Sequence, residues 1–134
     1  MMGIKDIETV IVGAVSGFGM VPLSSIFVEG DYPVGVVSSE RVVIIVKEAR
    51  KSPIFNTGFV EVNFCVPDVD GRANHQRLQE IESQAVEYFW DDVVGDYGNT
   101  TYRYGLYSHG VHEDKDLGCH FANIRLLFET LNVR

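Results

Sequence analysis

Apolar residues recur every three or four positions over residues 4–18, and this spacing places them on one side of a helix. Asp6 and Glu8 fall in the first turns, where acidic side chains interact favourably with the helix dipole. Gly17 and Gly19 follow and are typical of a helix end. The pattern therefore predicts an amphipathic N-terminal helix over residues 4–18. Its apolar stripe consists of Ile4, Ile7, Ile11, Ala14 and Phe18.

Strand patterns occupy much of the remaining chain. Residues 41–47, RVVIIVK, form a mostly β-branched apolar run, which predicts a strand buried on both faces. Residues 58–66, 100–107 and 119–131 alternate between apolar and other side chains, as strands with one buried face do. In the first of these three, one face carries Val60, Val62, Phe64 and Val66.

A second helix is predicted over residues 73–94. Its central stripe is Leu78, Ile81, Ala85 and Phe89, which Val86, Trp90 and Val93 widen on one side and Tyr88 on the other. The apolar arc covers about half of the circumference, whereas packing on one sheet face needs a stripe of roughly 100°. We therefore expect a second flank of this helix to be buried, and another chain is one candidate for covering it.

The order of elements predicts the fold class. Short extended pieces are expected at residues 26–28 and 34–37, and polar loops at residues 48–58 and 108–118. Because the strands are grouped and do not alternate with helices, the class is α+β. We expect one domain, residues 1–134, built as an antiparallel sheet of four to five strands with the N-terminal helix and one long helix packed on it.

Net charge and cysteine content narrow the functional classes. The chain has 134 residues and a formal net charge of −8. This argues against a dedicated nucleic-acid binder, although an acidic wall suits a protein that DNA passes without sticking. Cys65 and Cys119 lie in predicted strands and are expected to be buried thiols of a reducing compartment. The first residues lack a signal-peptide pattern, and no apolar run reaches about 18 residues, so we expect a cytoplasmic protein without a membrane span.

Asp68 and Asp70 are the first candidates for chemistry, because they stand two residues apart with a glycine after them. A calcium loop would need an oxygen ligand at position 72 and a glutamate at position 79, where this chain has Arg72 and Gln79. We therefore expect the two aspartates to accept hydrogen bonds from free amides at the start of the second helix.

The histidines do not follow a recurring zinc pattern. His109, His112 and Cys119 have the wrong spacing for a structural site, and adjacent strand residues such as Cys119 and His120 point to opposite faces. His109 and His112 are expected to be solvated loop residues. Neither cysteine looks exposed beside a histidine, and no G-x-S-x-G motif is present. We expect no metal, no cofactor and no enzymatic activity.

Aromatic residues are dense in the second half of the chain. Four tyrosines fall within eleven residues, namely Tyr97, Tyr102, Tyr104 and Tyr107. Tyrosine and tryptophan are favoured at subunit contacts because they combine an apolar ring with a polar tip. The alternative is a sheet surface that uses residues of high β-propensity. The sequence leaves both interpretations open.

The chain resembles the tail-completion or tail-terminator proteins of long-tailed phages and prophages. The resemblance lies in the short N-terminal helix, in SSIFVEGDYPVGVVS before a hydrophobic strand, and in GFVEVNFCVPDVDGRANHQRLQEIE, where a strand passes a Pro-Asp corner into a helix. A closing pair of strands follows. The resemblance covers most of the chain, and the long segment YSHGVHEDKDLG is where this chain departs from it.

The resemblance implies a structural role in the virion tail, assembled in the cytoplasm of a bacterial host. Such proteins form a ring, commonly a hexamer, that caps the tail tube protein and offers a docking surface to the head-connector protein. DNA passes through the lumen without sequence-specific binding. A closed ring uses contacts between unlike faces of neighbouring copies.

Six residues are candidates for the subunit interface. In the predicted loop 48–58, Ile54 and Phe55 would anchor contacts, and Arg50 and Lys51 would pair with acidic surface on a neighbour. Trp90 and Tyr107 complete the set.

Two other functions stay open. One is a small-ligand-binding or enzymatic α+β domain, with the tyrosine-rich strand, His109 and His112 lining a pocket. The other is a different virion joint, such as a head-closure or connector subunit.

Overall fold

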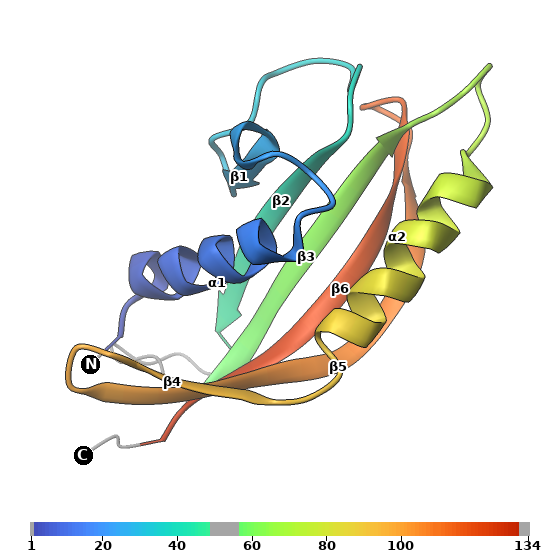
Figure 1. Ribbon diagram of the computed structural model, residues 1–134. Helices are drawn as coiled ribbons and strands as arrows, with labels where there is room; N and C mark the ends of the chain where they lie inside the picture. The colour runs from blue at the N-terminus through green and yellow to red at the C-terminus, as the bar shows by residue number, and fades with distance from the viewer. Residues whose placement is uncertain (1, 49–56, 132–134) are drawn as a thin grey trace.

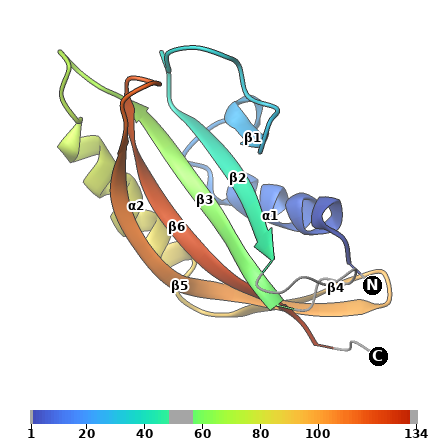
Figure 2. The same cartoon turned by 180° about the vertical axis from the view of Figure 1, so that it is seen from behind.

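The computed structural model describes residues 2–48 and 57–131. It shows two helices lying on one face of a strongly twisted sheet (Figure 1). Turned by 180°, the sheet lies in front of both helices (Figure 2). We call the face under the helices the covered face and the opposite face the open face. The elements are, in chain order, α1 (Ile4–Phe18), a 3-10 turn η1 (Leu23–Ser25), β1 (Ile26–Val28), β2 (Arg41–Glu48), β3 (Thr57–Pro67), α2 (His75–Tyr88), β4 (Val93–Tyr97), β5 (Thr100–Asp114) and β6 (Cys119–Thr130).

The strands form one sheet in the order β1-β2-β3-β6-β5-β4. Only β1 and β2 run parallel, and every other neighbouring pair is antiparallel. The α+β class is therefore confirmed. The expected sheet of four to five strands is wrong, because β1 adds to one edge and β4, hidden in the sequence behind a helix pattern, adds to the other.

α1 has the bounds that its apolar spacing predicts. At its start the Gly3 N–H donates to Asp6 Oδ2 over 2.9 Å. At its end Gly19 adopts φ 77°, the left-handed conformation that commonly terminates helices. Ile7 and Ile11 of the predicted stripe are fully buried, and Ala14 and Phe18 pack against the core. Ile4 is 45% exposed and does not face the core, whereas Val15, outside the predicted stripe, is fully buried.

The core lies between the covered face and the two helices. Alternate residues of β3 point into it as predicted, and β6 supplies the matching positions across the ladder. α1 packs on β1 and β2, and α2 packs mainly on β6 and β5 (Figure 1). The core residues of β3 and β6 are Val60, Val62, Phe64, Val66, Ala122, Ile124, Leu126 and Phe128.

β2 is buried on both faces over its first half, as its continuous apolar run predicts. Val42 and Ile44 lie in the main core. Val43 belongs to a second, smaller cluster with Val37, Cys65 and Cys119 on the open face. Both cysteines are free and buried, which confirms the expected burial of the two thiols.

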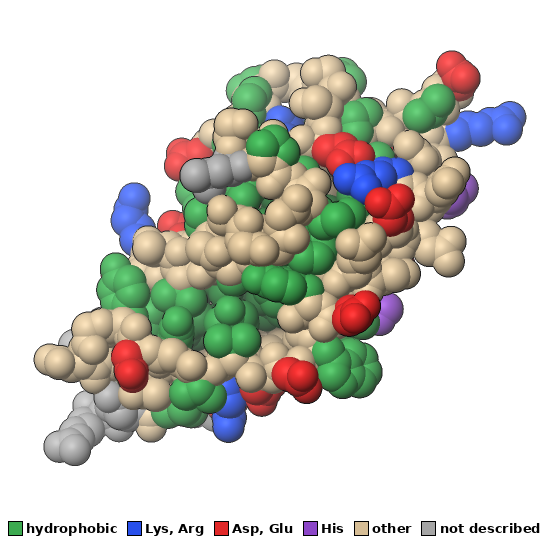
Figure 3. Space-filling model, viewed as in Figure 1, with side chains coloured by type: hydrophobic (Ala, Val, Ile, Leu, Met, Phe, Trp, Pro, Cys, Tyr) green, Lys and Arg blue, Asp and Glu red, His purple; other side chains and the backbone are tan. Residues whose placement is uncertain are grey.

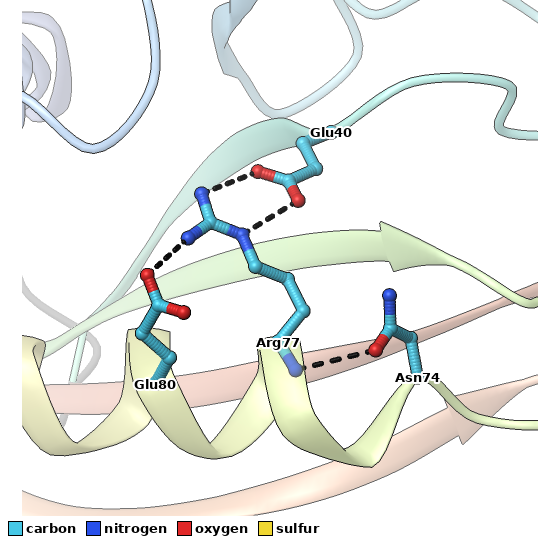
Figure 4. Close-up of polar contacts among 4 residues, drawn as sticks. All are labelled: Glu40, Asn74, Arg77 and Glu80. Atoms are coloured by element: carbon cyan, nitrogen blue, oxygen red, sulfur yellow. Dashed lines mark hydrogen bonds and ion pairs between the residues drawn. The ribbon is translucent and has the colours of Figure 1, made fainter.

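An ion pair holds α2 to the start of β2. The Arg77 guanidinium donates from Nε and Nη2 to the two carboxylate oxygens of Glu40, over 2.7 and 2.8 Å, and from Nη1 to Glu80 over 2.8 Å (Figure 4). Bidentate arginine–carboxylate pairs fix geometry as well as adding energy. The contact therefore fixes the first turns of α2 over the sheet.

The predicted end of the second helix is wrong, because α2 stops at Tyr88, six residues before position 94. The Phe89 carbonyl accepts a hydrogen bond from the Leu106 N–H over 3.0 Å, so the chain leaves the helix there and joins the edge of the sheet. Val93 and Val94 then enter β4, as β-branched residues favour. The apolar stripe assigned to the helix was therefore too wide, because Val93 belongs to β4 and Trp90 follows the helix end.

The predicted loop 108–118 is also wrong, because β5 continues through Asp114 and pairs with β6 along nearly its whole length. The register shifts between Leu106 and Ser108, which marks a β-bulge at Tyr107. A bulge places two consecutive residues opposite one partner and reverses the alternation beyond it. This reversal concealed the second half of the strand.

Asp68 and Asp70 do not cap α2, contrary to expectation. Asn74 is the N-cap, and its Oδ1 accepts from the Arg77 N–H over 3.2 Å. Asp70 and Gly71 both have positive φ, 51° and 76°, and form the centre of a two-residue turn. This is the conformation that Asp-Gly favours in tight hairpins.

Of the two expected extended pieces, residues 26–28 form β1, whereas residues 34–37 do not form a strand. The segment crosses one end of the open face, where the Val37 N–H donates to the Leu117 carbonyl.

Candidate subunit interface

Four of the six predicted interface residues, Arg50, Lys51, Ile54 and Phe55, lie outside the described residues. The other two, Trp90 and Tyr107, are 67% and 59% exposed. Trp90 follows α2 and precedes β4, whereas Tyr107 occupies the bulge of β5. The structure therefore leaves both aromatic side chains accessible, on separate elements.

β4 is the most exposed strand of the sheet, and it forms one of its two edges. Val93, Val94 and Tyr97 are 42%, 61% and 38% exposed. No strand of the described chain pairs with its outer edge. Proteins usually protect such edges with lysine, proline, bulges or short strands. The sequence of β4, VVGDY, contains neither lysine nor proline.

Trp90 and Tyr88 extend this exposed apolar surface towards the end of α2. The Tyr88 ring packs on Phe18 with centroids 5.0 Å apart, and its hydroxyl donates to the Ala14 carbonyl over 2.8 Å. α1 of the same chain thus covers part of the helix flank that the sequence leaves unassigned. Figure 3 shows hydrophobic side chains gathered on this side between α1 and the β4–β5 hairpin. We call Tyr88, Trp90, Val93, Val94 and Tyr97 the β4 patch.

Two local features hold β4 in place. Only glycine fits at position 95, because the Tyr102 ring lies against the backbone there and any Cβ would overlap the ring. At the tip of the hairpin, the negative charge of Asp6, together with a hydrogen bond to it, raises the pKa of the Tyr97 hydroxyl. The hairpin tip therefore lies against the first turn of α1.

The loop before β4 reaches over the open face. A Cβ on Gly105 would overlap the Asp92 carboxylate, so glycine at this position leaves room for the aspartate. Arg103 lies 4.0 Å from the Asp92 carboxylate and donates to Glu129 over 3.0 Å. The hydrogen bond to Glu129 raises the pKa of Arg103, which therefore stays charged.

The open face is organised by cross-strand pairs of polar, charged and aromatic side chains. Arg125 lies over the Phe59 ring at 4.0 Å, and Phe59 packs on Tyr107 with centroids 4.9 Å apart. Next to them, Lys47 pairs with Glu61 over 2.6 Å. Such pairs stabilise neighbouring strands, and they leave the face accessible to another molecule.

The histidines are not in a loop, contrary to expectation. His109 and His112 both lie in β5, beyond the bulge. His109 is opposite Ile124 on the covered side and contacts Glu82 of α2 over 2.9 Å. His112 is opposite Phe121 and packs on that ring at 5.5 Å, on the open side. Residues three apart in a regular strand point to opposite faces, so the two imidazoles cannot line one pocket.

His120 forms a separate contact with acidic residues at the end of the sheet. Its Nδ1 lies 2.7 Å from Asp68 Oδ1, and its Nε2 lies 3.5 Å from Glu113 Oε2. Thus Asp68 is hydrogen-bonded to the imidazole of His120 and does not cap the helix. Across residues 2–48 and 57–131, no group of three or more histidine, cysteine, aspartate or glutamate side chains is arranged to hold a metal ion.

The two thiols affect each other. A hydrogen bond with Cys119 lowers the pKa of Cys65, aided by the nearby Arg41 charge and opposed by burial. The same hydrogen bond, followed by burial, raises the pKa of Cys119. Their positions inside predicted strands led us to expect two buried thiols, but their proximity depends on the pairing of β3 with β6.

Neither helix of the described chain is long and apolar enough to cross a membrane.

Comparisons with known proteins identify the fold but no family. No family model and no curated protein matches the chain. Nine chains of solved structures are similar to it. One of these, which has only a sequence identifier for a name, is 12% identical with a TM-score of 0.67, and the match covers 100% of this chain and 99% of the other. At this level of identity the likeness concerns the fold alone, which the two proteins share over their whole length.

Proposed function

We propose that this protein is a structural component of a phage or prophage tail, a tail-terminator-like subunit that assembles with copies of itself into a closed ring. The ring caps the tail tube protein and presents a docking surface to the head-connector protein. In this role the chain binds other proteins and transforms no substrate. It would be assembled in the bacterial cytoplasm and end in the virion tail.

The observation that carries the proposal is the free outer edge of β4, a short strand without lysine or proline. A strand with a free outer edge offers unpaired backbone groups to another chain, and exposed apolar side chains on both of its faces make pairing more favourable. The β4 patch adds a tryptophan and two tyrosines, residues enriched in interface centres. A chain that stayed solitary would leave this surface open to nonspecific association.

A closed ring also needs a second, unlike surface, because neighbours related by rotation contact each other through different faces. The open face is a suitable second surface, since Phe59, Tyr107 and Arg125 form an aromatic and cationic group there. The net charge of −8 would disfavour adhesion of DNA to a lumen lined by this protein.

The small-ligand alternative loses its specific support, because His109 and His112 point to opposite faces and cannot line a common pocket with the tyrosine-rich strand. A different virion joint, such as a head-closure or connector subunit, would also assemble as a closed ring through contacts between unlike faces. Such a ring would differ from a tail terminator in the partner protein that it binds.

The mass of the assembled particle tests the proposal. We expect size-exclusion chromatography with light scattering to find a ring of defined mass, commonly a hexamer in this family, either for the free protein or after addition of tail tubes. Val94→Lys in β4 should weaken assembly by roughly 30-fold or more in subunit concentration, the effect of losing one interface hot spot.

Val34→Lys is the matched control, because Val34 is also an exposed valine but lies in the segment between β1 and β2. Circular dichroism should show both variants folded. A wild-type protein that stays monomeric at all concentrations and ignores tail tubes would overturn the proposed function. Binding to purified connectors without any effect on tubes would favour the other virion joint.

A further inference from the structure

Arg41 is a buried cation with incomplete hydrogen bonding. Its residue is only 7% exposed, and its Nη1 donates to the Pro33 carbonyl over 3.2 Å. Within residues 2–48 and 57–131, its Nε and Nη2 find no hydrogen-bond partner, and both atoms are shielded from solvent. Native proteins rarely leave buried polar groups unsatisfied, and a buried charge without a counter-charge is especially unfavourable.

The surroundings of Arg41 do not supply the missing counter-charge. The adjacent carboxylate, Glu40, is engaged on both oxygens by Arg77. Asp114 is near the two thiols, but its Oδ1 accepts from the Leu117 N–H. Within the described residues, no carboxylate lies within ion-pair distance of the Arg41 guanidinium. The Tyr32 ring, 5.2 Å from the guanidinium carbon, offers only a cation–π contact.

The charge of Arg41 is felt by a neighbouring group. Beyond the dominant hydrogen bond from Cys119 and against the effect of burial, Arg41 contributes to lowering the pKa of the Cys65 thiol. A group that stabilises a negative sulfur would stabilise another anion placed nearby. Cys65 itself is 6% exposed and lies in the small apolar cluster, so it is not a site for an incoming ligand.

A pocket of about 200 Å³ lies beside Arg41, between β1 with its preceding turn and the segment that leads into β2. Four of its lining residues are serines, two on each wall: Ser24 and Ser25 from the turn η1, and Ser38 and Ser39 from the segment before β2. Arg41, Phe27 and Glu40 also line it, and the carboxylate of Glu40 is paired with Arg77. Serine hydroxyls around a guanidinium are hydrogen-bond donors suited to an oxyanion.

We infer that this serine-lined pocket binds a small tetrahedral oxyanion of the phosphate class, with Arg41 as its counter-charge. The Arg41 side chain releases the Pro33 carbonyl and turns its free N–H groups to the anion, which exchanges one neutral contact for charge-assisted bonds. This site is independent of the proposed ring function, because none of its residues belongs to the β4 patch.

Inorganic phosphate is the probe. Isothermal titration calorimetry on the full chain, in chloride buffer of matched ionic strength, should show saturable binding, and the melting temperature should rise with phosphate as bound ligand stabilises the folded state. Acetate, tested in parallel, should bind more weakly because it lacks the tetrahedral set of oxygens. No binding heat and identical melting temperatures in phosphate and chloride would overturn the inference.

Two variants locate the site. Arg41→Lys should weaken phosphate binding about tenfold or more, since lysine keeps the charge but loses the planar donor fork. Because a change at the buried Arg41 also perturbs packing, Ser38→Ala with Ser39→Ala provides a second test at two exposed positions. This double variant should weaken binding about three- to tenfold.

Ser83→Ala with Ser108→Ala is the matched control, because both serines are exposed and lie away from the pocket. Unchanged affinity in the Ser38 and Ser39 variant, or equal loss in the control, would place the anion elsewhere and overturn the assignment. A ring that forms normally while phosphate fails to bind would reject this site and leave the proposed function intact.

Discussion

The covered face of the sheet is lined by apolar side chains under α1 and α2, whereas the open face carries paired polar, charged and aromatic side chains. Neighbouring residues of β6 belong to opposite sides of this contrast: Ile124 is fully buried beneath the helices, and Arg125 lies over Phe59 on the open face. The difference separates two tasks. Burial on the covered face stabilises the fold, and pairing on the open face fixes strand register at a surface that still meets solvent.

The largest difference between the faces should appear at these two neighbouring residues. Ile124→Ala removes buried methyl groups and leaves a cavity, so the free energy of unfolding should fall by about 2–5 kcal/mol. Arg125→Ala removes a cation–π contact on the open face and should cost about 1 kcal/mol. Urea denaturation followed by circular dichroism measures both. Equal losses would mean that the open face contributes to stability as the core does.

A smaller effect is expected at Asn123, a buried polar residue of the open face. Asn123 Nδ2 donates to Asn63 Oδ1 over 2.7 Å and to Glu61 Oε1 over 3.2 Å. Asn123→Ala leaves these acceptors without their donor, so the free energy of unfolding should fall by about 1–2 kcal/mol. Gln84→Ala, at an exposed position of α2, is the control and should change little. An unchanged free energy of unfolding in Asn123→Ala would contradict this prediction and show that water replaces the lost donor.

The smallest effect is a pH dependence carried by Glu61. Burial alone would raise the pKa of this carboxyl, but hydrogen bonds from Lys47 and Asn123, together with the charges of Lys47 and Arg125, lower it below the ordinary 4.5. A lowered pKa in the folded state stabilises the protein above pH 4.5, and this contribution is lost as the pH falls through the folded-state pKa.

Glu61→Gln tests this contribution. The variant should be less stable than the wild type at pH 7, by under about 1 kcal/mol, and the gap should close in acid. Urea denaturation at pH 7 and near pH 3 measures the two gaps. A gap that stays constant across this range would exclude Glu61 as its source.

The sequence predicted elements whose pattern is local and regular. The bounds of α1 follow from its apolar spacing and Gly19, and alternation placed the core residues of β3 and most of β6 correctly. These features depend only on which side chains meet water, which a helix or strand determines by itself.

The errors arose where one pattern concealed another. Trp90, Val93 and Val94 fit the spacing of α2, although they follow its end and enter β4. The bulge at Tyr107 reversed the alternation of β5, so its second half resembled a loop. The Asp70-Gly71 pair is a strong signal for a tight turn, and it forms that turn and not a helix cap.

The candidate interface was only partly predictable. The exposure of Trp90 and Tyr107 agrees with their candidacy, but the free edge of β4 appears only once the strand order is known. The same holds for Arg41, which the sequence places at the start of an apolar strand. Its burial and its missing partners depend on the segment that folds over it.

The central place of β6 has a consequence for how the chain is made. In the order β1-β2-β3-β6-β5-β4, this strand joins two groups of strands that otherwise have no pairing with each other. During synthesis the sheet therefore stays divided until residues 119–130 have left the ribosome. The sheet of the nascent protein cannot close before β6 is available, and a chain interrupted shortly before that point would present two incomplete half-sheets to the quality-control machinery of the cell.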